Sequence, residues 1–383
     1  MLRVLLAGGG TSGHINPAVA IAEIIKKNHP DAEFCFAGTP TGIEAKIVRD
    51  LGYRFEEIDV HGFQRSLSLG NIKRNAVALK CLAFSGSRAK KIINDFKPDL
   101  VIGTGGYVSG PIVRKAAKMK IKTAIHEQNA YPGVTTRLLS KLVDKVMLTV
   151  IEAKEYLEDG IDYTVTGLPV RAAFASHDRA QAKRELGFDE NEICILSTGG
   201  SLGSYVLNEN IAELLKWEQE NGIKINHIHS YGTHESNKDF VKKLTDSGVT
   251  VDGYNRFLIS DYINMPLCMS AADLVISRCG ANALTELEAL GRASILIPSP
   301  NVAGNHQYHN GMVLHNAGAG IVIEEKELTP KKLIDTVSGL CDNKERIEEL
   351  SQAAHRLYIK DTDERIYNAL YQLIIEATES KGL

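Results

Sequence analysis

Short apolar runs alternate along this chain with longer segments in which apolar residues recur every three or four positions. Residues 4–7 are apolar enough for one buried strand, and after a glycine loop the spacing of Ala18, Ile21 and Ile25 predicts a helix with one buried face. The same pattern predicts further strands at residues 33–37, 54–60, 99–103, 121–125, 143–148, 163–166, 193–197, 273–277 and 295–297. Because strands and helices alternate, the sheets should be parallel.

The two halves of the chain share one plan. Each half begins with a strand that enters a glycine-rich loop, at residues 8–13 and 199–204. Each later contains an Asp-Leu-Val-Ile strand that runs into a second glycine loop, at residues 99–106 and 273–280. This repetition predicts an α/β protein of two doubly wound, Rossmann-like domains that face each other across a cleft.

The length of 383 residues is enough for two or three domains with sizeable cores. We place the first domain at residues 1–168 and the second at residues 169–359, because the break in pattern begins at Gly167 and Leu168. The segment from about residue 360 to 383 has a helical pattern, and we expect it to dock back on the first domain.

The first glycine loop predicts an anion site. A strand, a loop of small residues and a helix start leave backbone N–H groups pointing outward, and the helix dipole adds roughly half a positive charge. Gly8, Gly10 and Gly13 also match the dinucleotide fingerprint, but no acid closes the second strand at residues 33–37, which disfavours NAD. We expect Pro17 in the first helical turn. The alternative is a tight turn without a ligand.

Composition narrows the class of protein. The net charge of −3 gives no reason to expect nucleic acid as a partner, and the six cysteines lack zinc-ligand spacing. They read as small buried apolar residues of a reducing compartment. No signal peptide and no long apolar stretch are apparent, so we expect a cytoplasmic protein.

One segment, from His61 to Lys91, mixes apolar and basic residues. No acid occurs from Val60 through Ile93. A stretch of this kind suits contact with an anionic membrane surface. An ordinary helix with solvated lysines is the equal alternative.

Polar residues cluster where predicted strands end. His126, Glu127, Gln128 and Asn129 follow one strand, at the edge where parallel sheets bind ligands. Glu286, about one turn into a predicted helix, could accept two hydrogen bonds from a ribose diol. Residues 305–310 carry amides and imidazoles that suit sugar hydroxyls, although an ordinary capped helix is the favoured explanation when this cluster is taken by itself. Arg171 or Arg278 could neutralise a leaving diphosphate without a metal.

An ordered series of motifs carries a family resemblance across nearly the whole chain. The motifs are Gly9-Gly10-Thr11-Ser12-Gly13-His14-x-x-Pro17, Gly105-Gly106-Tyr107-Val108-Ser109-Gly110-Pro111, His126-Glu127-Gln128-Asn129, Pro169-Val170-Arg171, Gly199-Gly200-Ser201, Ser277-Arg278-x-Gly280-Ala281 and His306-Gln307-x-x-Asn310. Together they resemble the MurG family of N-acetylglucosaminyltransferases.

The resemblance implies a GT-B fold and an inverting transfer that needs no metal and no other cofactor. The donor would be UDP-N-acetylglucosamine, and the acceptor the 4-hydroxyl of the muramoyl sugar of lipid I, an undecaprenyl-diphosphate muramoyl pentapeptide. The product would be lipid II for peptidoglycan. The protein would act as a peripheral protein on the inner face of the cell membrane, with other cell-wall synthesis proteins as partners.

The resemblance also implies roles for individual residues. Thr11, Ser12 and Gly13 would serve the acceptor's diphosphate and the reacting sugar. The donor would be bound by side chains near the diphosphate (Arg171, Ser201), the uracil (Ile263), the ribose (Glu286) and the sugar (Asn129, Gln307), with the backbone of Ala281, Asn282, Ala283, Leu284 and Thr285 nearby.

His14 is our first choice as the general base. A neutral imidazole can take the proton of the attacking hydroxyl near neutral pH. Glu127 is the second choice, and Tyr107 is expected to position substrate. The alternative for His14 is that it only caps the helix or binds phosphate.

Four positions depart from the family pattern. Leu202 stands where Gln is usual, Ser204 where Ala is usual, and Leu168 and Thr136 where Asn is usual. These changes leave two alternatives open. One is a divergent GT-B glycosyltransferase that uses another UDP-sugar or a glycolipid acceptor. The other is a non-catalytic protein of the cell-wall machinery that binds a UDP-sugar.

Overall fold

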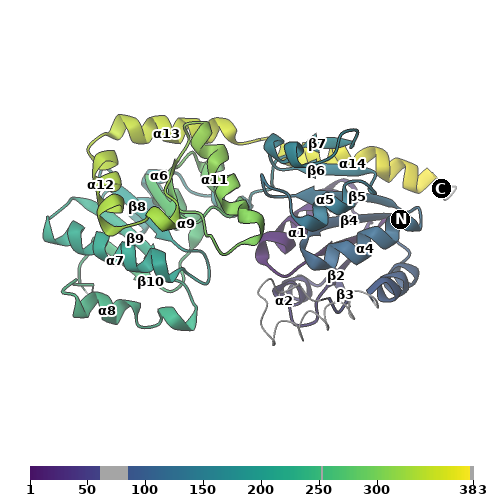
Figure 1. Cartoon of the computed structure of the whole chain (residues 1–383), viewed down its shortest axis with the longest axis horizontal. Helices are drawn as coiled ribbons and strands as arrows, with labels where there is room; N and C mark the ends of the chain where they lie inside the picture. The colour runs from purple at the N-terminus through teal and green to yellow at the C-terminus, as the bar shows by residue number, and fades with distance from the viewer. Residues whose placement is uncertain (61–84, 252, 380–383) are drawn as a thin grey trace. The chain divides into compact units, whose positions relative to one another are not determined.

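The computed structural model describes residues 1–60, 85–251 and 253–379, and it divides into two compact units (Figure 1). The first unit comprises Met1–Pro169 and Ile359–Leu383, and the second comprises Val170–Tyr358. These divisions fall one residue after and one residue before the boundaries expected from the sequence. Most of the basic and apolar segment from His61 to Lys91 lies outside the described residues.

The first unit is built on a seven-stranded parallel sheet. Its order is β3(Arg54–Glu57), β2(Glu33–Gly38), β1(Arg3–Gly8), β4(Leu100–Gly105), β5(Lys122–Glu127), β6(Lys145–Leu148) and β7(Tyr163–Val165). In register, Val4 pairs with Phe34 on one side and with Leu100 on the other. The chain leaves the central pair β1 and β4 in opposite directions, as it does in dinucleotide-binding folds.

Alternating side chains of these strands form two apolar cores. Leu6 and Ile102 face one core, whereas Leu5 and Val101 face the other. The first core is covered by α1(Ser12–Asn28), α2(Ile43–Asp50) and α14(Thr362–Glu379). The second core is covered by the helical residues 85–96, α4(Gly106–Lys118), α5(Val134–Leu139) and the 3₁₀ turn η1(Ile151–Tyr156).

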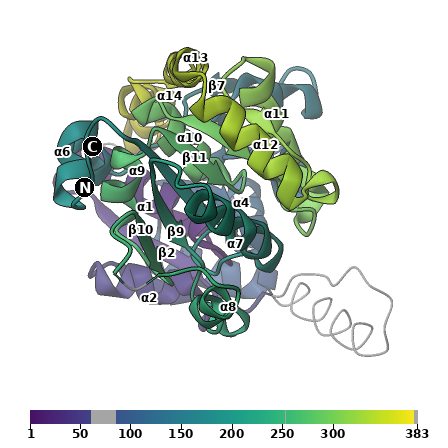
Figure 2. The ribbon, with the colours of Figure 1, turned by 90° about the vertical axis from the view of Figure 1, so that its left-hand side faces the viewer.

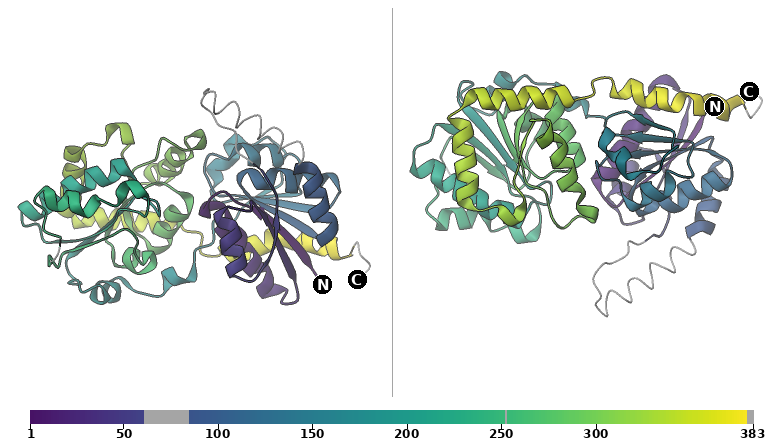
Figure 3. Two further views of the ribbon diagram at one scale, coloured as in Figure 1. Left: turned by 90° about the horizontal axis from the view of Figure 1, so that it is seen from below. Right: turned by 45° about the horizontal axis from the view of Figure 1, so that its top comes forward.

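The C-terminal helix α14 belongs to the first unit. Ile366, Leu370 and Ile374 recur every four residues and bury one stripe of the helix in the core that α1 also covers. Figure 3 shows α14, in yellow, running along the first unit. The chain therefore returns to its first sheet after completing the second unit.

The second unit repeats the topology with six parallel strands. Their order is β10(Phe257–Ser260), β9(Ile225–Ser230), β8(Ile193–Thr198), β11(Leu274–Ser277), β12(Ala293–Leu296) and β13(Ile321–Val322). One face packs on η2(Ala172–Ala175), α6(Arg179–Glu185), α9(Met265–Ala271), α10(Ala281–Leu290), α11(His306–Asn316) and part of α13(Lys344–Leu357). The other face packs on α7(Tyr205–Glu220), α8(Phe240–Asp246) and α12(Pro330–Cys341), which Figure 2 shows on the near side of this unit. Short 3₁₀ turns complete it: η3(Glu235–Asn237), η4(Ala303–Asn305) and η5(Glu325–Glu327).

Two expectations about local structure were wrong. Helix α1 begins at Ser12, so Pro17 is its sixth residue rather than a member of the first turn. The helix starts early because the N–H groups of His14 and Ile15 both bond to the carbonyl of Thr11. Strands β9, β10 and β13 were not expected at all.

Among the described residues, no helix combines the length and apolar character needed to cross a bilayer.

Candidate functional site

In the first unit, the glycine loops after β1 and β4 lie side by side where the strand order reverses. In open α/β sheets this is the place where ligands bind. Gly106 has a positive φ of 75°, and a Cβ there would lie 2.2 Å from the carbonyl oxygen of Gly9. Glycine is therefore needed for the two loops to approach backbone to backbone.

A buried carboxylate lies beneath the first glycine loop. Glu44 accepts hydrogen bonds from the Gly10 N–H (3.1 Å), the Thr39 N–H (3.0 Å) and the Thr39 hydroxyl (2.7 Å). Burial alone would raise the pKa of Glu44, but these hydrogen bonds outweigh it and leave the pKa below its ordinary value. The Gly10 N–H is consequently taken, and the predicted anion site is narrower than the whole loop.

The N–H groups that remain for a ligand belong to the start of α1. Thr11 is the N-cap residue, with extended backbone and no side-chain hydrogen bond to the helix. No acid occurs in the first turn, and the side chains of Thr11 and Ser12 are exposed. With Gly13, they present backbone donors and two hydroxyls at a helix N-terminus, which suits an anionic group.

His14 is held on three sides by other elements. The Thr104 hydroxyl at the end of β4 donates to the His14 carbonyl at 2.7 Å. Gly105 lies behind the imidazole, since a Cβ at that position would be 2.6 Å from His14 Nδ1. Nδ1 itself lies 3.2 Å from the side-chain oxygen of Gln128. The ring is half-buried and fixed at the edge of the glycine loops.

The end of β5 supplies a chain of polar contacts behind His14. Gln128 Nε2 lies 2.8 Å from the His126 carbonyl and 3.1 Å from His126 Nδ1. His126 Nε2 lies 3.0 Å from the carbonyl of Gly167. His126 is fully buried, and this burial lowers its pKa, so the ring stays neutral.

Glu127 is engaged with its own loop. Its Oε1 accepts from the backbone N–H of Asn129 (2.9 Å) and from the Asn129 side chain (3.0 Å), and its Oε2 accepts from the Gly133 N–H (3.0 Å). Only 3% of the residue is exposed. This geometry favours Glu127 as a group that orients Asn129 over its predicted role as a second candidate base.

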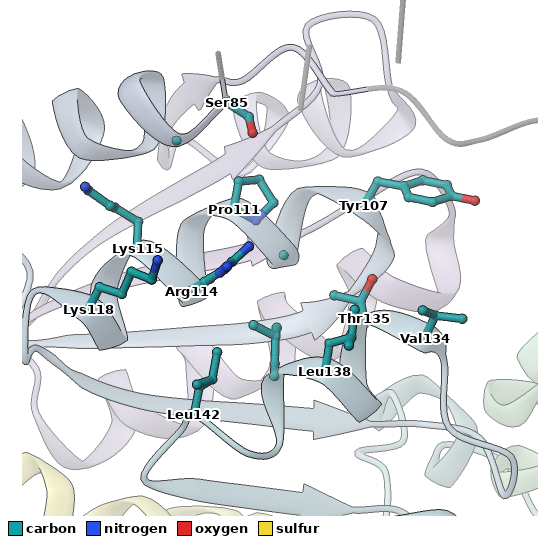
Figure 4. Close-up of a pocket in the computed structure, with 13 residues that line it drawn as sticks. Ser85, Tyr107, Pro111, Arg114, Lys115, Lys118, Val134, Thr135, Leu138 and Leu142 are labelled. Carbon is teal, nitrogen blue, oxygen red and sulfur yellow. The ribbon is translucent and has the colours of Figure 1, made fainter. Parts of the chain in front are cut away.

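Tyr107 stands at the rim of a pocket of about 670 Å³ on the first unit (Figure 4). The residue is 57% exposed. Apolar side chains on the far wall are exposed as well, namely Val134, Leu138 and Leu142. Arg114, Lys115 and Lys118 of α4 line the same pocket. It is therefore an open apolar hollow with a cationic border.

The second unit has a corresponding loop after β8. The side chain of Ser201 is exposed, and its carbonyl accepts from the backbone and hydroxyl of Thr233. Ser204 is the N-cap residue of α7, and its hydroxyl also accepts from Arg278. Arg278 forms a further ion pair with Glu325. The Arg278 side chain is 13% exposed, whereas that of Arg171 is 57% exposed, which makes Arg171 the more accessible candidate for a diphosphate.

Helix α10 begins without a side-chain cap. Its N-cap is Gly280, and its first turn contains no acid. The backbone N–H groups of Ala281, Asn282 and Ala283 therefore have no partner within the helix and point out of its N-terminus. Leu284 and Thr285 are buried beneath them, and the N–H of Leu284 bonds back to Gly280.

Glu286 and Arg171 form an ion pair at 3.1 Å. The Arg171 side chain is 57% exposed, whereas that of Glu286 is 13% exposed. Burial raises the pKa of Glu286, and the charge of Arg171 opposes this shift only in part. In this structure the side chain predicted to bind the ribose and the side chain predicted to bind the diphosphate are therefore paired with each other.

Gln307 has its side-chain orientation fixed by two backbone donors. The N–H groups of Cys279 (3.3 Å) and Ser299 (2.9 Å) both point at Oε1, so the amide NH₂ faces away from them. This leaves two donors for a sugar hydroxyl or carbonyl. Ile263, the expected uracil contact, is 7% exposed and packs into the core of the second unit.

The positions that depart from the family pattern lie in different environments. Leu202 is 63% exposed, and its backbone carbonyl, not its side chain, holds Asn237 at 2.9 Å. Leu168 and Thr136 are buried.

No group of three or more metal-ligand side chains occurs within the part of the chain that the structure describes.

Two participants were not assigned from the sequence, Glu44 and Gln128. Gln128 lies within a motif that was recognised, but its neighbours Glu127 and Asn129 attracted the assignments. Glu44 lies outside all the motifs. Glu23, Asp31 and Glu33 are all closer to the first glycine loop in the sequence, so no sequence signal singled out Glu44.

Comparisons with known proteins agree across the chain. The family model "Glycosyltransferase family 28 N-terminal domain" matches residues 4–148, and the corresponding "C-terminal domain" matches residues 194–366. A relative from Acetivibrio thermocellus is 40% identical over 373 residues, which cover 97% of this chain and 98% of the relative. A relative from Bacillus pumilus is 36% identical over 374 residues, with 97% and 99% covered. Both are described as UDP-N-acetylglucosamine–N-acetylmuramyl-(pentapeptide) pyrophosphoryl-undecaprenol N-acetylglucosamine transferases.

Solved structures resemble the chain over its whole length. The crystal structure of Acinetobacter baumannii MurG has a TM-score of 0.75 and 25% identity, with 97% of this chain and all of that chain covered. A co-structure of S. aureus MnaA with UDP has a TM-score of 0.69, with 98% of each chain covered. At 13% identity, the second likeness concerns the fold alone.

Proposed function

The chain belongs to the MurG family within glycosyltransferase family 28, and we propose here how its residues carry out that family's reaction. It is a GT-B glycosyltransferase that transfers N-acetylglucosamine from UDP-N-acetylglucosamine to lipid I and so forms lipid II for peptidoglycan. Identity of 40% over nearly the full length favours this activity over the alternatives of a different UDP-sugar or a non-catalytic protein.

The second unit binds the donor in this proposal. The diphosphate meets the unpaired N–H groups at the start of α10, together with Arg171 and the hydroxyl of Ser201. Glu286 releases Arg171 and accepts hydrogen bonds from the ribose hydroxyls. The free NH₂ of Gln307 addresses the N-acetylglucosamine. The exchange at Glu286 matters because a buried carboxylate needs a partner in both states.

Ile263 lies beside the uracil, and Asn129, oriented by Glu127, contacts the sugar. These two roles come from the family resemblance. The first unit binds the acceptor, with its diphosphate and reacting sugar at Thr11, Ser12 and Gly13. Tyr107 positions the acceptor at the rim of the pocket.

His14 acts as the general base. The 4-hydroxyl of the muramoyl sugar attacks the anomeric carbon of the donor from the face opposite UDP, and the bond to the UDP oxygen breaks. The hydroxyl proton passes to the imidazole, and the negative charge that develops on UDP is stabilised by backbone N–H groups and Arg171. The proposal therefore requires neither a metal nor another cofactor. The observation that carries it is the three-sided fixation of His14 beside the helix α1 donors.

The pocket bordered by α4 and α5 supports a further part of the proposal. Its exposed leucines and its basic border suit contact with the anionic surface of a membrane. We infer that the protein is peripheral on the inner face of the cell membrane, where its lipid-linked acceptor resides. Other cell-wall synthesis proteins remain expected partners.

A turnover assay tests the reaction. Purified protein with UDP-N-acetylglucosamine and a short-chain lipid I analogue should release UDP, whereas UDP-glucose should not replace the donor. Replacing the base, in His14→Ala, should lower turnover roughly 100-fold or more, with UDP affinity little changed. Transfer from UDP-glucose but not from UDP-N-acetylglucosamine would contradict the donor assignment. A wild-type rate in the variant would remove His14 from the mechanism.

A further inference from the structure

A continuous series of hydrogen bonds connects His14 to the interior of the first unit. It runs from His14 Nδ1 to Gln128 Oε1 (3.2 Å), from Gln128 Nε2 to His126 Nδ1 (3.1 Å), and from His126 Nε2 to the Gly167 carbonyl (3.0 Å). Gln128 Nε2 makes one more contact, to the His126 carbonyl at 2.8 Å. His126 and Gln128 are 1% and 4% exposed, so water does not compete for these contacts.

Backbone carbonyls fix the protons along this series, because a carbonyl oxygen can only accept. The Gly167 carbonyl requires a hydrogen on His126 Nε2, so in the neutral ring Nδ1 is an acceptor. The His126 carbonyl requires the NH₂ end of Gln128 on its side, since a flipped amide would set two oxygens 2.8 Å apart. Both constraints independently give Gln128 the same orientation.

The orientation of Gln128 then decides the tautomer of His14. The amide oxygen of Gln128 faces Nδ1, so Nδ1 must carry the hydrogen. Nε2 is left with a lone pair. A general base needs that lone pair, and holding the productive tautomer of a histidine base can be worth several orders of magnitude in rate. The same hydrogen bond persists after Nε2 has taken a proton, so nothing behind the ring has to rearrange.

We propose that Gln128, supported by His126, is a positioning residue that holds His14 in the Nδ1–H tautomer and thereby makes Nε2 the base for transfer. This inference rests on the proposed function for its kinetic consequence, but not for the tautomer itself. It gives two residues of the His126–Asn129 motif a task distinct from that of Glu127 and Asn129.

The tautomer can be read directly by ¹⁵N NMR of protein labelled at histidine, with the His14 signal assigned by its absence in His14→Gln. In the unsubstituted protein we expect the hydrogen on Nδ1 and an unprotonated Nε2. In Gln128→Leu, which keeps the bulk and removes the amide, the Nδ1–H tautomer should no longer dominate.

Kinetics test the consequence. Gln128→Leu should lower kcat roughly 10- to 100-fold, somewhat less than loss of the base itself, while the KM for UDP-N-acetylglucosamine changes by less than about 3-fold. His126→Leu should have a smaller effect, because the His126 backbone carbonyl still orients Gln128. The matched control is Thr149→Val, which removes a buried hydroxyl that donates to the Glu127 carbonyl at 2.9 Å at the same edge of the sheet. This control should leave kcat and the His14 spectrum unchanged.

Two results would overturn the inference. One is a hydrogen on His14 Nε2 in the unsubstituted protein. The other is a kcat for Gln128→Leu equal to that of Thr149→Val. If the unsubstituted protein transferred no sugar, the proposed function would fail, whereas the NMR measurement would still decide whether Gln128 sets the tautomer.

Discussion

A buried histidine in the second unit should make the stability of this protein depend on pH in a way that can be isolated. His229 on β9 is fully buried, and its Nδ1 lies 2.8 Å from the Ser197 hydroxyl. Its Nε2 is buried and has no hydrogen-bond partner among the residues that the structure describes. Burial, with a smaller effect of the neighbouring His227, lowers the pKa of His229 from 6.5 to about 3.

Whether stability rises or falls with pH follows from which state, folded or unfolded, binds the proton more readily. In the unfolded chain His229 takes up a proton below about pH 6.5, whereas in the folded chain it stays neutral until the pH approaches about 3. Its contribution to stability is therefore complete above pH 6.5 and is lost as the pH falls. At about pH 5, 1.5 units below the unfolded pKa, the loss is about 2 kcal/mol, at about 1.4 kcal/mol per unit. At about pH 7 it is close to zero.

Urea unfolding measures this loss. Trp217, the single tryptophan, lies on α7 in the same unit, so its fluorescence reports the unfolding of this unit. The variant for comparison is His229→Phe, which keeps an aromatic ring beside Phe240 but has no group that titrates. When the pH falls from 7 to 5, the free energy of unfolding of the unsubstituted protein should decrease by about 2 kcal/mol more than that of the variant. Comparing these differences cancels the other groups that titrate in both proteins.

An exposed histidine provides the control. His315→Gln, in the last turn of α11, should lose the same stability between the two pH values as the unsubstituted protein. If the unsubstituted protein and His229→Phe lost equal amounts, His229 would have to be protonated within the fold. The argument from burial would then be refuted.

Three further substitutions test other features. Glu44→Gln should lower the free energy of unfolding by about 1–3 kcal/mol, because the new NH₂ group would face a backbone N–H donor. Thermal unfolding followed by circular dichroism measures this, and a midpoint equal to that of the unsubstituted protein would contradict it. Glu286→Ala should weaken UDP binding roughly 10-fold or more in calorimetric titration, since the ribose hydroxyls lose a carboxylate acceptor; an unchanged Kd would remove Glu286 from the nucleotide site. Leu138→Ser should reduce sedimentation with anionic vesicles, whereas Tyr371→Ser, on the opposite side of the same sheet, should not; equal losses would rule out the pocket as the contact surface.

Much of the fold was predictable, because strands buried on both faces of a parallel sheet appear as continuous apolar runs. Strand β9 was missed for a physical reason. It carries His227 and His229 into the core, where Glu218 and Ser197 satisfy His227. A run that alternates histidine with isoleucine does not look buried until those partners are known. Strand β13 has only two residues, which is too short for any pattern.

The site was predictable as a set of strand ends but not as a set of contacts. The motifs mark where β1, β4 and β5 stop in the first unit and where β8 and β11 stop in the second, and within each unit the topology brings such ends together. The contact of Glu44 with Gly10 spans 34 positions, and that of Gln128 with His14 spans 114. The pairing of individual polar atoms depends on strand register and on side-chain rotamers. No local sequence pattern encodes either of these.

The two units have the same strand order around their first glycine loops, yet they differ in charge beneath them, and this difference supports the assignment of the nucleotide to the second unit. In the first unit, the Gly10 N–H bonds to the carboxylate of Glu44. In the second unit, the equivalent Gly200 N–H bonds to the neutral hydroxyl of Thr198 at 3.1 Å. A buried negative charge close behind a loop weakens its attraction for an anion, whereas a hydroxyl does not. The diphosphate of UDP should therefore prefer the second loop, which carries Ser201, over the first.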